Sequence, residues 1–425
     1  MSTGTPPRTA KRVLGNIVID TRPLRIRDFR RLWVSTAITA IGSQLTAVAA
    51  PKQVYDLTGS SGYVGLTGAV GLAALVIFGL WGGAIADAFD RRRVVTISNV
   101  GIAVTSGLLW AQAFAGLNSV WVIFVLLFTQ QSFVAVNMPT RNAMLPRLVP
   151  ADLIAPANAL NSTVFMFGAV FGPLVAGSLI PVLGLSTLYL VDTVALFLST
   201  ALVLRLPEMP PGNGAVTGAG LRHIVAGFRY LSTQRVLLAS FLVDLIAMIF
   251  GMPRALFPEM AERTFGDPHG GGAALGWLYA AIPIGAVVLG LFSGWVSRLP
   301  RQGVVVTLAI AAWGLSMAAF GLSTVLWLAV VFLALGGAAD QVSAIHRSAI
   351  LQTAATDEMR GRIQGVFIVV VAGGPRLADL VHGWAATGPG TGAATTVGGF
   401  LVVVLTVAAV AALPAFWRYL VPNRV

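Results

Sequence analysis

The chain has 425 residues, of which 56% are hydrophobic and only 10% are charged, and its mean hydropathy is +0.82. Soluble domains carry charge on roughly a quarter of their residues, so this composition excludes a soluble globular protein and predicts an integral membrane protein. The net charge of +12 therefore does not indicate nucleic-acid binding, and the absence of cysteine excludes disulfides and thiolate metal sites.

Apolar segments of membrane-spanning length follow one another along most of the chain. A hydrocarbon core of ~30 Å requires about 20 apolar helical residues, and a helix satisfies its backbone groups internally. We therefore expect an all-α integral membrane protein with twelve transmembrane helices in two pseudo-symmetric six-helix bundles. The predicted spans are residues 31–56, 62–86, 94–116, 119–140, 156–180, 186–206, 236–258, 273–297, 303–322, 325–346, 363–385 and 395–417.

The basic residues predict the orientation of these spans. Of the 28 Lys and Arg residues, 24 fall in the tails and in alternate loops on one side, whereas only Arg254 and Arg263 fall in the loops of the other side. Short loops rich in Lys and Arg stay in the cytoplasm. We therefore expect a basic N-terminal tail, residues 1–30, and a C-terminal tail, residues 418–425, that are both cytoplasmic.

The central connection, residues 207–235, separates an N-terminal six-helix bundle, residues 31–206, from a C-terminal one, residues 236–417. It begins with a Pro/Gly-rich linker, and apolar residues then recur at helical spacing from Leu221 to Leu231. This pattern predicts a short amphipathic helix on the inner leaflet. The alternative interpretation is a simple extension of the next span.

The two halves contain similar stretches. The sequence "RNAMLPRLVPADL" begins at Arg141 after the fourth span, and "RSAILQTAATDEM" begins at Arg347 after the tenth. "GAVFGPLVAG" (168–177) in the fifth span has a looser counterpart, "GGPRLADLVHG" (373–383), in the eleventh. Two related six-span halves with a substrate site between them are typical of secondary transporters.

The turn after the second span, "GGAIADAFDRRRVV" (82–95), is unusually charged, because the seven residues from Asp87 to Arg93 carry five charges. With twelve spans and the pattern in the fifth span, this turn resembles that of the major facilitator superfamily, in which Gly83, Asp87, Arg91 and Arg92 match the motif. Ala88 and Asp90 depart from it, where the family has a basic residue and a glycine. "NMPTRNAMLPRLVPADL" and "DEMRGRIQGV" are similar to the branch of enterobactin exporters, macrolide efflux proteins and actinobacterial drug pumps.

The resemblance implies a conformational latch at this turn. Asp87 would meet the start of the eleventh span, near Arg360 and Arg362, only when the cytoplasmic side is closed, with Arg91 and Arg92 beside it. The alternative is that these arginines only enforce orientation. In the family the fifth-span pattern, with Gly168, Gly172 and Pro173, is associated with exporters that exchange substrate for protons. Its alternative role is close helix packing by small residues.

Ionisable residues inside a span are costly and are functional candidates. Asp244 in the seventh span and Asp340 in the tenth have no obvious basic partner on their own helix, and these spans line the central cavity in the resembled fold. Both are therefore candidates for proton coupling. Arg376 and Asp379 in the eleventh span lie three residues apart, so they form either an ion pair or a gate, and we include them in the coupling candidates.

Two further ionisable groups are interpreted as structural. Asp192 lies in the outer third of the sixth span, which is peripheral in the superfamily, and His382 lies near the outer end of the eleventh. Lys52 and Asp56, one helical turn apart, are expected to form a pair at the outer rim.

The predicted substrate cavity is otherwise neutral. The fourth span lacks the buried arginine of many proton-coupled exporters, because Arg141 comes only at its cytoplasmic end. The expected cavity residues are Gln44, Gln130, Gln131, Asn137, Met248 and Met252.

No enzyme signature is present: there is no phosphate-binding Gly-Lys-Ser/Thr loop, and the four histidines lack metal-ligand spacing. The sequence and the resemblance together predict a monomeric secondary exporter in the bacterial cytoplasmic (inner) membrane. It would exchange amphipathic, drug- or siderophore-like molecules for protons by alternating access, without a cofactor or metal. The alternatives are an importer or uncoupled carrier of the same fold, and a receptor or scaffold that does not transport.

Overall fold

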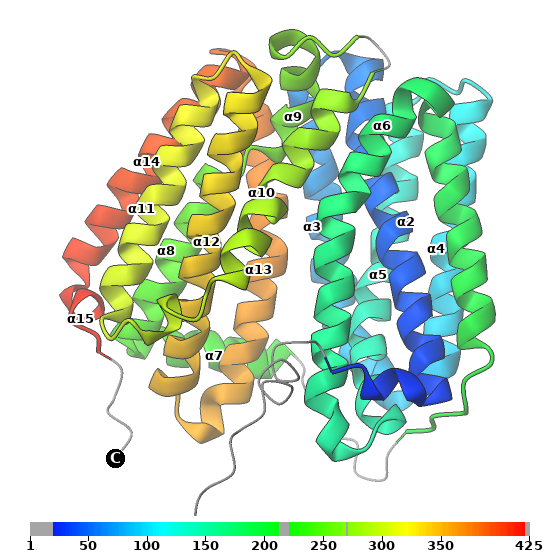
Figure 1. Cartoon of the computed structure of the whole chain (residues 1–425), viewed down its shortest axis with the longest axis horizontal. Helices are drawn as coiled ribbons and strands as arrows, with labels where there is room; N and C mark the ends of the chain where they lie inside the picture. Colours follow the sequence, from blue (N-terminus) through cyan, green and yellow to red (C-terminus); the bar gives the residue numbers. More distant parts are fainter. Residues whose placement is uncertain (1–19, 212–220, 269–270, 421–425) are drawn as a thin grey trace, which may run out of the picture.

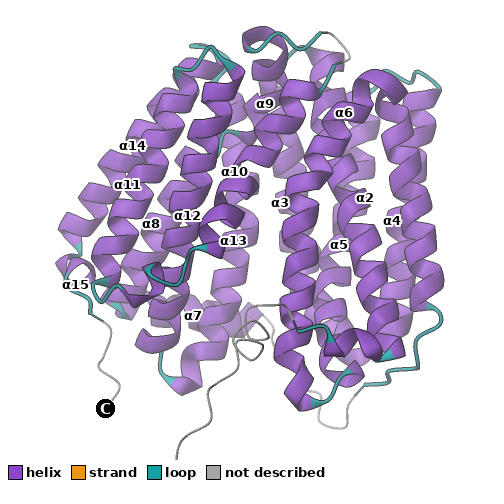
Figure 2. Ribbon diagram, viewed as in Figure 1, coloured by secondary structure: helices purple, strands orange, loops and turns teal. Residues whose placement is uncertain are grey.

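The computed structural model describes residues 20–211, 221–268 and 271–420. Within these ranges every regular element is helical and no strand occurs (Figure 2). Eleven of the described helices are long and apolar enough to cross a membrane.

The N-terminal half begins with the 3-10 turn η1 (Arg22–Arg25). Its long helices are α2 (Arg27–Thr58), α3 (Ser61–Ala88), α4 (Arg91–Phe114), α5 (Val120–Leu148) and, after the short turn η2 (Ala151–Leu153), α6 (Ile154–Val203).

Helix α6 supplies two membrane crossings. Its 50 residues would extend about 75 Å as one straight helix, which is more than twice the hydrocarbon thickness of ~30 Å. The chain bends at Gly184, whose φ of 74° and ψ of 165° are non-helical and strongly favour glycine. The bend lies between the predicted fifth and sixth spans, so the described helices make twelve crossings.

The C-terminal half starts from the short helix α7 (Leu221–Thr233), which ends before α8 and lies across one end of this half (Figure 1). The remaining elements, in order, are α8 (Arg235–Gly251), η3 (Arg254–Leu256), α9 (Phe257–Glu259), η4 (Met260–Thr264), α10 (Ala273–Leu291), η5 (Val296–Arg298), α11 (Gln302–Gly321), α12 (Leu326–Ala354), α13 (Asp357–Ala385), α14 (Thr391–Ala412) and α15 (Pro414–Trp417).

Several helices extend beyond the predicted spans. Helix α5 continues eight residues past residue 140, α12 continues eight residues past residue 346, and α13 begins six residues before residue 363. Hydropathy detects only the apolar part of a helix, whereas these helices continue as polar ends. Consequently Arg141 and Arg347 lie within helices and not in loops.

The halves stand side by side and meet most closely at one end (Figure 1). We call the end where α2 begins and α14 ends the terminal side, and the other end the opposite side. Toward the opposite side α3 packs on α13 and α6 on α10 through glycines. A β-carbon added to Gly65 would lie 2.6 Å from the Asp379 carbonyl oxygen, and one added to Gly276 would lie 2.7 Å from the Pro173 carbonyl oxygen.

The same helices have more room toward the terminal side. A β-carbon added to Gly365, about four turns from Asp379 on a similar face of α13, would meet no described atom within 4 Å. The same is true of Gly361 on α13 and of Gly290 on α10. Among the described residues, the close contact between the halves is therefore concentrated toward the opposite side.

Candidate substrate cavity

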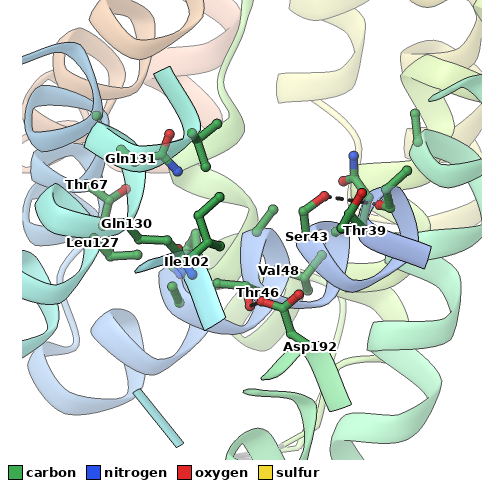
Figure 3. Close-up of a pocket in the computed structure, with 18 of the residues that line it drawn as sticks. Thr39, Ser43, Thr46, Val48, Thr67, Ile102, Leu127, Gln130, Gln131 and Asp192 are labelled. Atoms are coloured by element: carbon green, nitrogen blue, oxygen red, sulfur yellow. Dashed lines mark hydrogen bonds between the residues drawn. The ribbon is translucent and has the colours of Figure 1, made fainter. Parts of the chain in front are cut away.

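A cavity of about 460 Å³ lies between the halves, within the size range of small-molecule sites. The N-terminal half supplies most of its wall, from α2 to α6 (Figure 3). The C-terminal half adds residues of η3, α10 and α13. Its polar and ionisable lining side chains are Thr36, Thr39, Ser43, Gln44, Thr46, Thr67, Asn99, Gln130, Gln131, Asn137, Arg141, Asp192, Arg254, Tyr279, Arg376 and Asp379.

Four of the six expected cavity residues line this space: Gln44, Gln130, Gln131 and Asn137. The two methionines from α8 and its C-terminal end do not. Met248 packs against α13, where its sulfur would lie 2.6 Å from a β-carbon added to Gly374, and Met252 packs against the hydrophobic core.

Arg141 is held in a ring of neutral oxygen atoms. Its Nε donates to Asn137 Oδ1 at 2.8 Å and its Nη2 to Asn99 Oδ1 at 3.1 Å. The remaining donors reach hydroxyls of α2 and α6: Ser35 at 3.1 Å, Thr36 at 3.2 Å and Ser199 at 3.2 Å. No described carboxylate forms an ion pair with this guanidinium group.

The prediction that the fourth span lacks a buried arginine is therefore wrong. Arg141 is half-buried and faces the cavity because α5 continues past the apolar stretch. The similarity between the stretches that begin at Arg141 and at Arg347 was the sequence signal that could have identified this arginine.

Asp192 forms a second polar centre one layer deeper in the same wall. Thr46 and Ser106 each donate to Asp192 Oδ2 at 2.7 Å, and Gln130 Nε2 donates to Ser106 Oγ at 2.8 Å. Figure 3 shows Thr46 of α2 beside Asp192 of α6. Asp192 is only 2% exposed, yet its carboxyl group contributes to the cavity wall.

Asp244 and Asp340 share a basic partner. Arg347 forms an ion pair with Asp244 and a second one with Asp340 at 3.4 Å. The expectation that Asp340 has no basic partner on its own helix is wrong, because α12 extends to Ala354 and carries Arg347 seven residues after Asp340. Asp244 is buried, whereas the Asp340 side chain is 43% exposed, and neither is among the lining residues.

Arg376 and Asp379 both line the cavity, but they do not form an ion pair with each other in the described contacts. Arg376 Nη1 donates to the Ala372 carbonyl at 2.6 Å, and its Nη2 donates to Gln131 Oε1 at 3.2 Å, which joins α13 to α5 across the halves. Asp379 Oδ1 is buried without a described hydrogen-bond donor. Arg254, which the sequence analysis placed in a loop, also lines the cavity.

The fifth-span motif packs against α2 next to the cavity. Pro173 is a lining residue. A β-carbon added to Gly172 would lie 2.4 Å from the Gln44 β-carbon, and one added to Gly168 would lie 3.4 Å from the Ala40 carbonyl oxygen. These glycines thus allow α6 to approach α2 closely.

The charged turn between α3 and α4 is bound to its own half. Arg92 donates to the Leu206 carbonyl at 3.0 Å and pairs with Glu208 at 2.9 Å, and Arg91 donates to the Ala143 carbonyl at 3.0 Å. Gly83 belongs to α3, and the side chains of Asp87, Arg360 and Arg362 lie outside the described part of the structure.

Asp90, which departs from the motif, caps α4. Its Oδ1 accepts the backbone N–H of Arg93 at 2.9 Å, and its Oδ2 accepts that of Met209 at 2.5 Å. The turn therefore ends in a capped helix where the family pattern has a glycine.

Charged side chains connect the halves on the opposite side. Lys52 of α2 is 1% exposed and pairs with Asp56, as the spacing predicted, and with Glu262 of η4 at 3.5 Å. Ser61 of α3 donates to Glu259 of α9 at 2.5 Å. These contacts supplement the glycine-mediated packing.

Comparison with known proteins supports the transporter interpretation. Residues 20–419 match the family model described as transmembrane secretion effector. Over 345 residues the chain is 29% identical to the enterobactin exporter EntS of Shigella boydii serotype 18 and, equally, to that of Escherichia coli O1:K1 / APEC, covering 80% of each chain.

Solved structures share the fold at low sequence identity. A bacterial homolog of the human lysosomal transporter Spinster, in an inward-facing and unoccupied conformation, matches with a TM-score of 0.71 and 16% identity over 94% of this chain and 97% of its own. The nucleoside transporter NupG matches with a TM-score of 0.71 and 14% identity over 92% and 99%.

Proposed function

Since the chain belongs to the transmembrane secretion effector family of the major facilitator superfamily, we propose that this transporter is a secondary exporter of amphipathic small molecules. The cavity between the halves carries this proposal, because its walls come from both halves and it can be exposed to either side as they rock. The close packing of α3 on α13 and of α6 on α10 toward the opposite side supports alternating access.

The chemistry of the cavity favours an oxygen-rich, siderophore-like substrate. The wall contains both amide or hydroxyl groups and apolar side chains, and Arg141, Arg254 and Arg376 add three guanidinium groups. Guanidinium groups bind carboxylate and other planar anionic oxygens well. Relatives named as enterobactin exporters make enterobactin the first compound to test, and amphipathic drugs the second class.

We assign proton coupling first to carboxylates of the C-terminal half. Asp340 is the accessible member of the Asp244–Arg347–Asp340 cluster, and Asp379 lies in the cavity wall beside Arg376. Protonation of Asp340 or Asp379 would weaken their attraction to these arginines, which couples proton binding to helix position.

The charged turn is proposed as a latch on the terminal side. Asp87 would bind the start of α13 near Arg360 and Arg362 when this side closes, with Arg91 and Arg92 supporting the turn. Asp87→Asn should then insert normally but transport slowly. Asp90→Ala is the matched control, because loss of its cap should lower stability by about 1 kcal/mol without removing the latch; equal transport by Asp87→Asn and wild type would remove this assignment.

We further propose that the protein is a monomer in the bacterial cytoplasmic membrane, with the terminal side facing the cytoplasm. The basic residues of the α3–α4 turn and of the two chain ends favour this orientation. Labelling of single engineered cysteines with a membrane-impermeant reagent tests it directly, because the natural chain contains no cysteine.

The decisive experiment measures transport of enterobactin and of a drug panel in proteoliposomes under an imposed pH gradient or an imposed membrane potential. Gradient-driven movement toward the side opposite the termini is expected, with loss of pH dependence in Asp340→Asn or Asp379→Asn. Movement driven by potential alone would favour an uncoupled carrier of anions, for which the three cavity arginines are suited. No movement of any compound under either gradient would favour a receptor or scaffold.

A further inference from the structure

We propose that Asp192 is a proton-binding residue of the N-terminal half, facing the substrate cavity. This inference rests on the proposed proton coupling and adds a site in the half where the sequence indicated only neutral polar residues. A proton from water on one side would bind the carboxylate, and the same proton would leave to water on the other side.

The first observation is the position of the carboxyl group. Asp192 is almost fully buried at mid-helix in the second crossing of α6, yet it belongs to the cavity wall together with Thr46 and Gln130. The group is thus shielded from lipid and lies in the wall of the proposed substrate cavity. The expectation of a peripheral, purely structural Asp192 does not account for this place in the cavity wall.

The second observation is the unequal environment of its two oxygens. Oδ2 accepts hydrogen bonds from Thr46 and Ser106, whereas Oδ1 is buried without a described partner. Gly42 of α2 makes room for Oδ1, since a β-carbon added there would lie 2.5 Å from it. Oδ1 is therefore the oxygen available to a proton.

The third observation is the lack of a compensating cation. The charged groups on the surrounding membrane crossings bind elsewhere: Arg141 of α5 to five neutral oxygens, and Lys52 of α2 to Asp56 and Glu262. At the start of α4, Arg91 donates to the Ala143 carbonyl and Arg92 binds Leu206 and Glu208. The rest of α6 and all of α10 contain no charged side chain. Among titratable neutral groups, Tyr189 of α6 donates to Gln53, and Tyr279 of α10 donates to the Arg254 carbonyl.

This environment distinguishes Asp192 from the other described intramembrane acids. Asp244 and Asp340 have Arg347, and Asp379 has Arg376 one turn away. An isolated carboxylate in a membrane interior is costly, and binding a proton removes its charge. Hydroxyl donors on Oδ2 stabilise the ionised form as well, so the site supports both states.

Polar side chains continue from Asp192 to the Arg141 ring, which lies toward the terminal side. On each of three helices, a residue that bonds to Arg141 lies seven residues from a residue of the hydrogen-bonded cluster around Asp192. The pairs are Asn99 and Ser106 on α4, Asn137 and Gln130 on α5, and Ser199 and Asp192 on α6. Seven residues correspond to about 10 Å. Thr39 and Ser43 of α2 line the cavity between the two layers, so polar side chains are present over this distance.

The test uses the proton itself as the ligand of the full-length protein in lipid bilayers. Infrared difference spectra between acidic and alkaline conditions should show the carbonyl stretch of a protonated carboxyl group that disappears on alkalinisation. This band should be absent from Asp192→Asn and shifted in Gly42→Ala, whose methyl group presses on Oδ1. Gly107→Ala is the matched control, because its added β-carbon would only touch Thr193 at 3.6 Å.

Identical wild-type and Asp192→Asn spectra would overturn the proposal. Ser106→Ala removes one hydrogen bond to Oδ2 without changing the acid and should move the titration of the band. Thr105→Val is its control, because the Thr105 hydroxyl bonds only to its own helix. A titration unchanged in Ser106→Ala would contradict the assignment even if Asp192→Asn folded poorly.

Transport separates this inference from the proposed function. Asp192→Asn should retain exchange of enterobactin across proteoliposomes at equal concentrations and lose at least tenfold of the pH-gradient-driven rate. A variant with an undiminished pH-gradient-driven rate would overturn the role of Asp192 in coupling while leaving export intact. If wild type transports nothing although the band titrates, the exporter proposal fails and the proton site stands.

Discussion

Arg141 and Arg347 occupy equivalent places in the two halves but are stabilised differently. Arg141 donates to five neutral oxygens, whereas Arg347 pairs with the carboxylates of Asp244 and Asp340. Removing a cation from a buried ion pair leaves an uncompensated charge, and removing one from a ring of neutral dipoles does not. The two substitutions should therefore have different energetic consequences.

Arg347→Met should destabilise the protein by about 3–5 kcal/mol, the usual cost of breaking a buried ion pair from one side. The reason is that Asp244 stays buried without its cation. Adding Asp244→Asn should recover most of this loss, as measured by reversible unfolding in detergent. Arg141→Met is the matched control and should cost less; a double variant no more stable than Arg347→Met alone would contradict the explanation.

Arg141→Lys should lower stability by about 1 kcal/mol although the charge is retained. A lysine ammonium has three donors where the guanidinium has five, so at least two hydrogen bonds are lost, at about 0.6 kcal/mol each in a membrane protein. Arg147→Lys is the control, because this exposed residue makes one hydrogen bond, to the Pro210 carbonyl. Equal unfolding midpoints for Arg141→Lys and Arg147→Lys would show that the ring is not stabilising.

At the scale of helices, the sequence was sufficient for the number and order of crossings but not for their polar ends. Hydropathy located the spans because each contains about 20 apolar residues, and Gly184 separates two of them within α6. It placed Arg141 and Arg347 outside the spans, because a polar helix end has no hydropathy signal. The rings around Arg141 and Asp192 join residues far apart in sequence, so spacing within one helix could not reveal them.

Glycines on α10 should control the contact between halves according to their surroundings. A β-carbon at Gly276 would lie 2.7 Å from the Pro173 carbonyl oxygen, so Gly276→Val should force α10 away from α6. Gly290→Val is the matched control on the same helix, since no described atom lies within 4 Å of its added β-carbon. The rate at which an engineered cysteine of α6 on the opposite side reacts with an impermeant reagent should increase several-fold in Gly276→Val only. Equal reaction rates in both variants would count against a glycine-mediated closure.

In the whole molecule, polar and charged contacts join the two halves on the opposite side. Lys52, Glu262, Ser61 and Glu259 join α2 and α3 to the segment that follows α8. The charged turn between α3 and α4, in contrast, makes its described contacts within the N-terminal half. In the proposed alternating-access cycle, this asymmetry would correspond to the state that is closed on the opposite side.

Glu262→Gln should shift the protein toward a state open on the opposite side. The substitution removes the Lys52–Glu262 ion pair between the halves while Lys52 keeps Asp56 as its partner, so no buried charge is left alone. Glu262 is partly exposed, and such pairs contribute about 0.2–1 kcal/mol. The open population should accordingly rise by no more than about fivefold, as measured by distance distributions between spin labels on two engineered cysteines across that side.

Glu208→Gln provides a control of identical chemistry, because Glu208 pairs with Arg92 inside one half and its loss should leave the distances unchanged. A shift of the same size in both variants would indicate a general effect of lost charge, and the interhalf pair would then have no part in holding the opposite side closed.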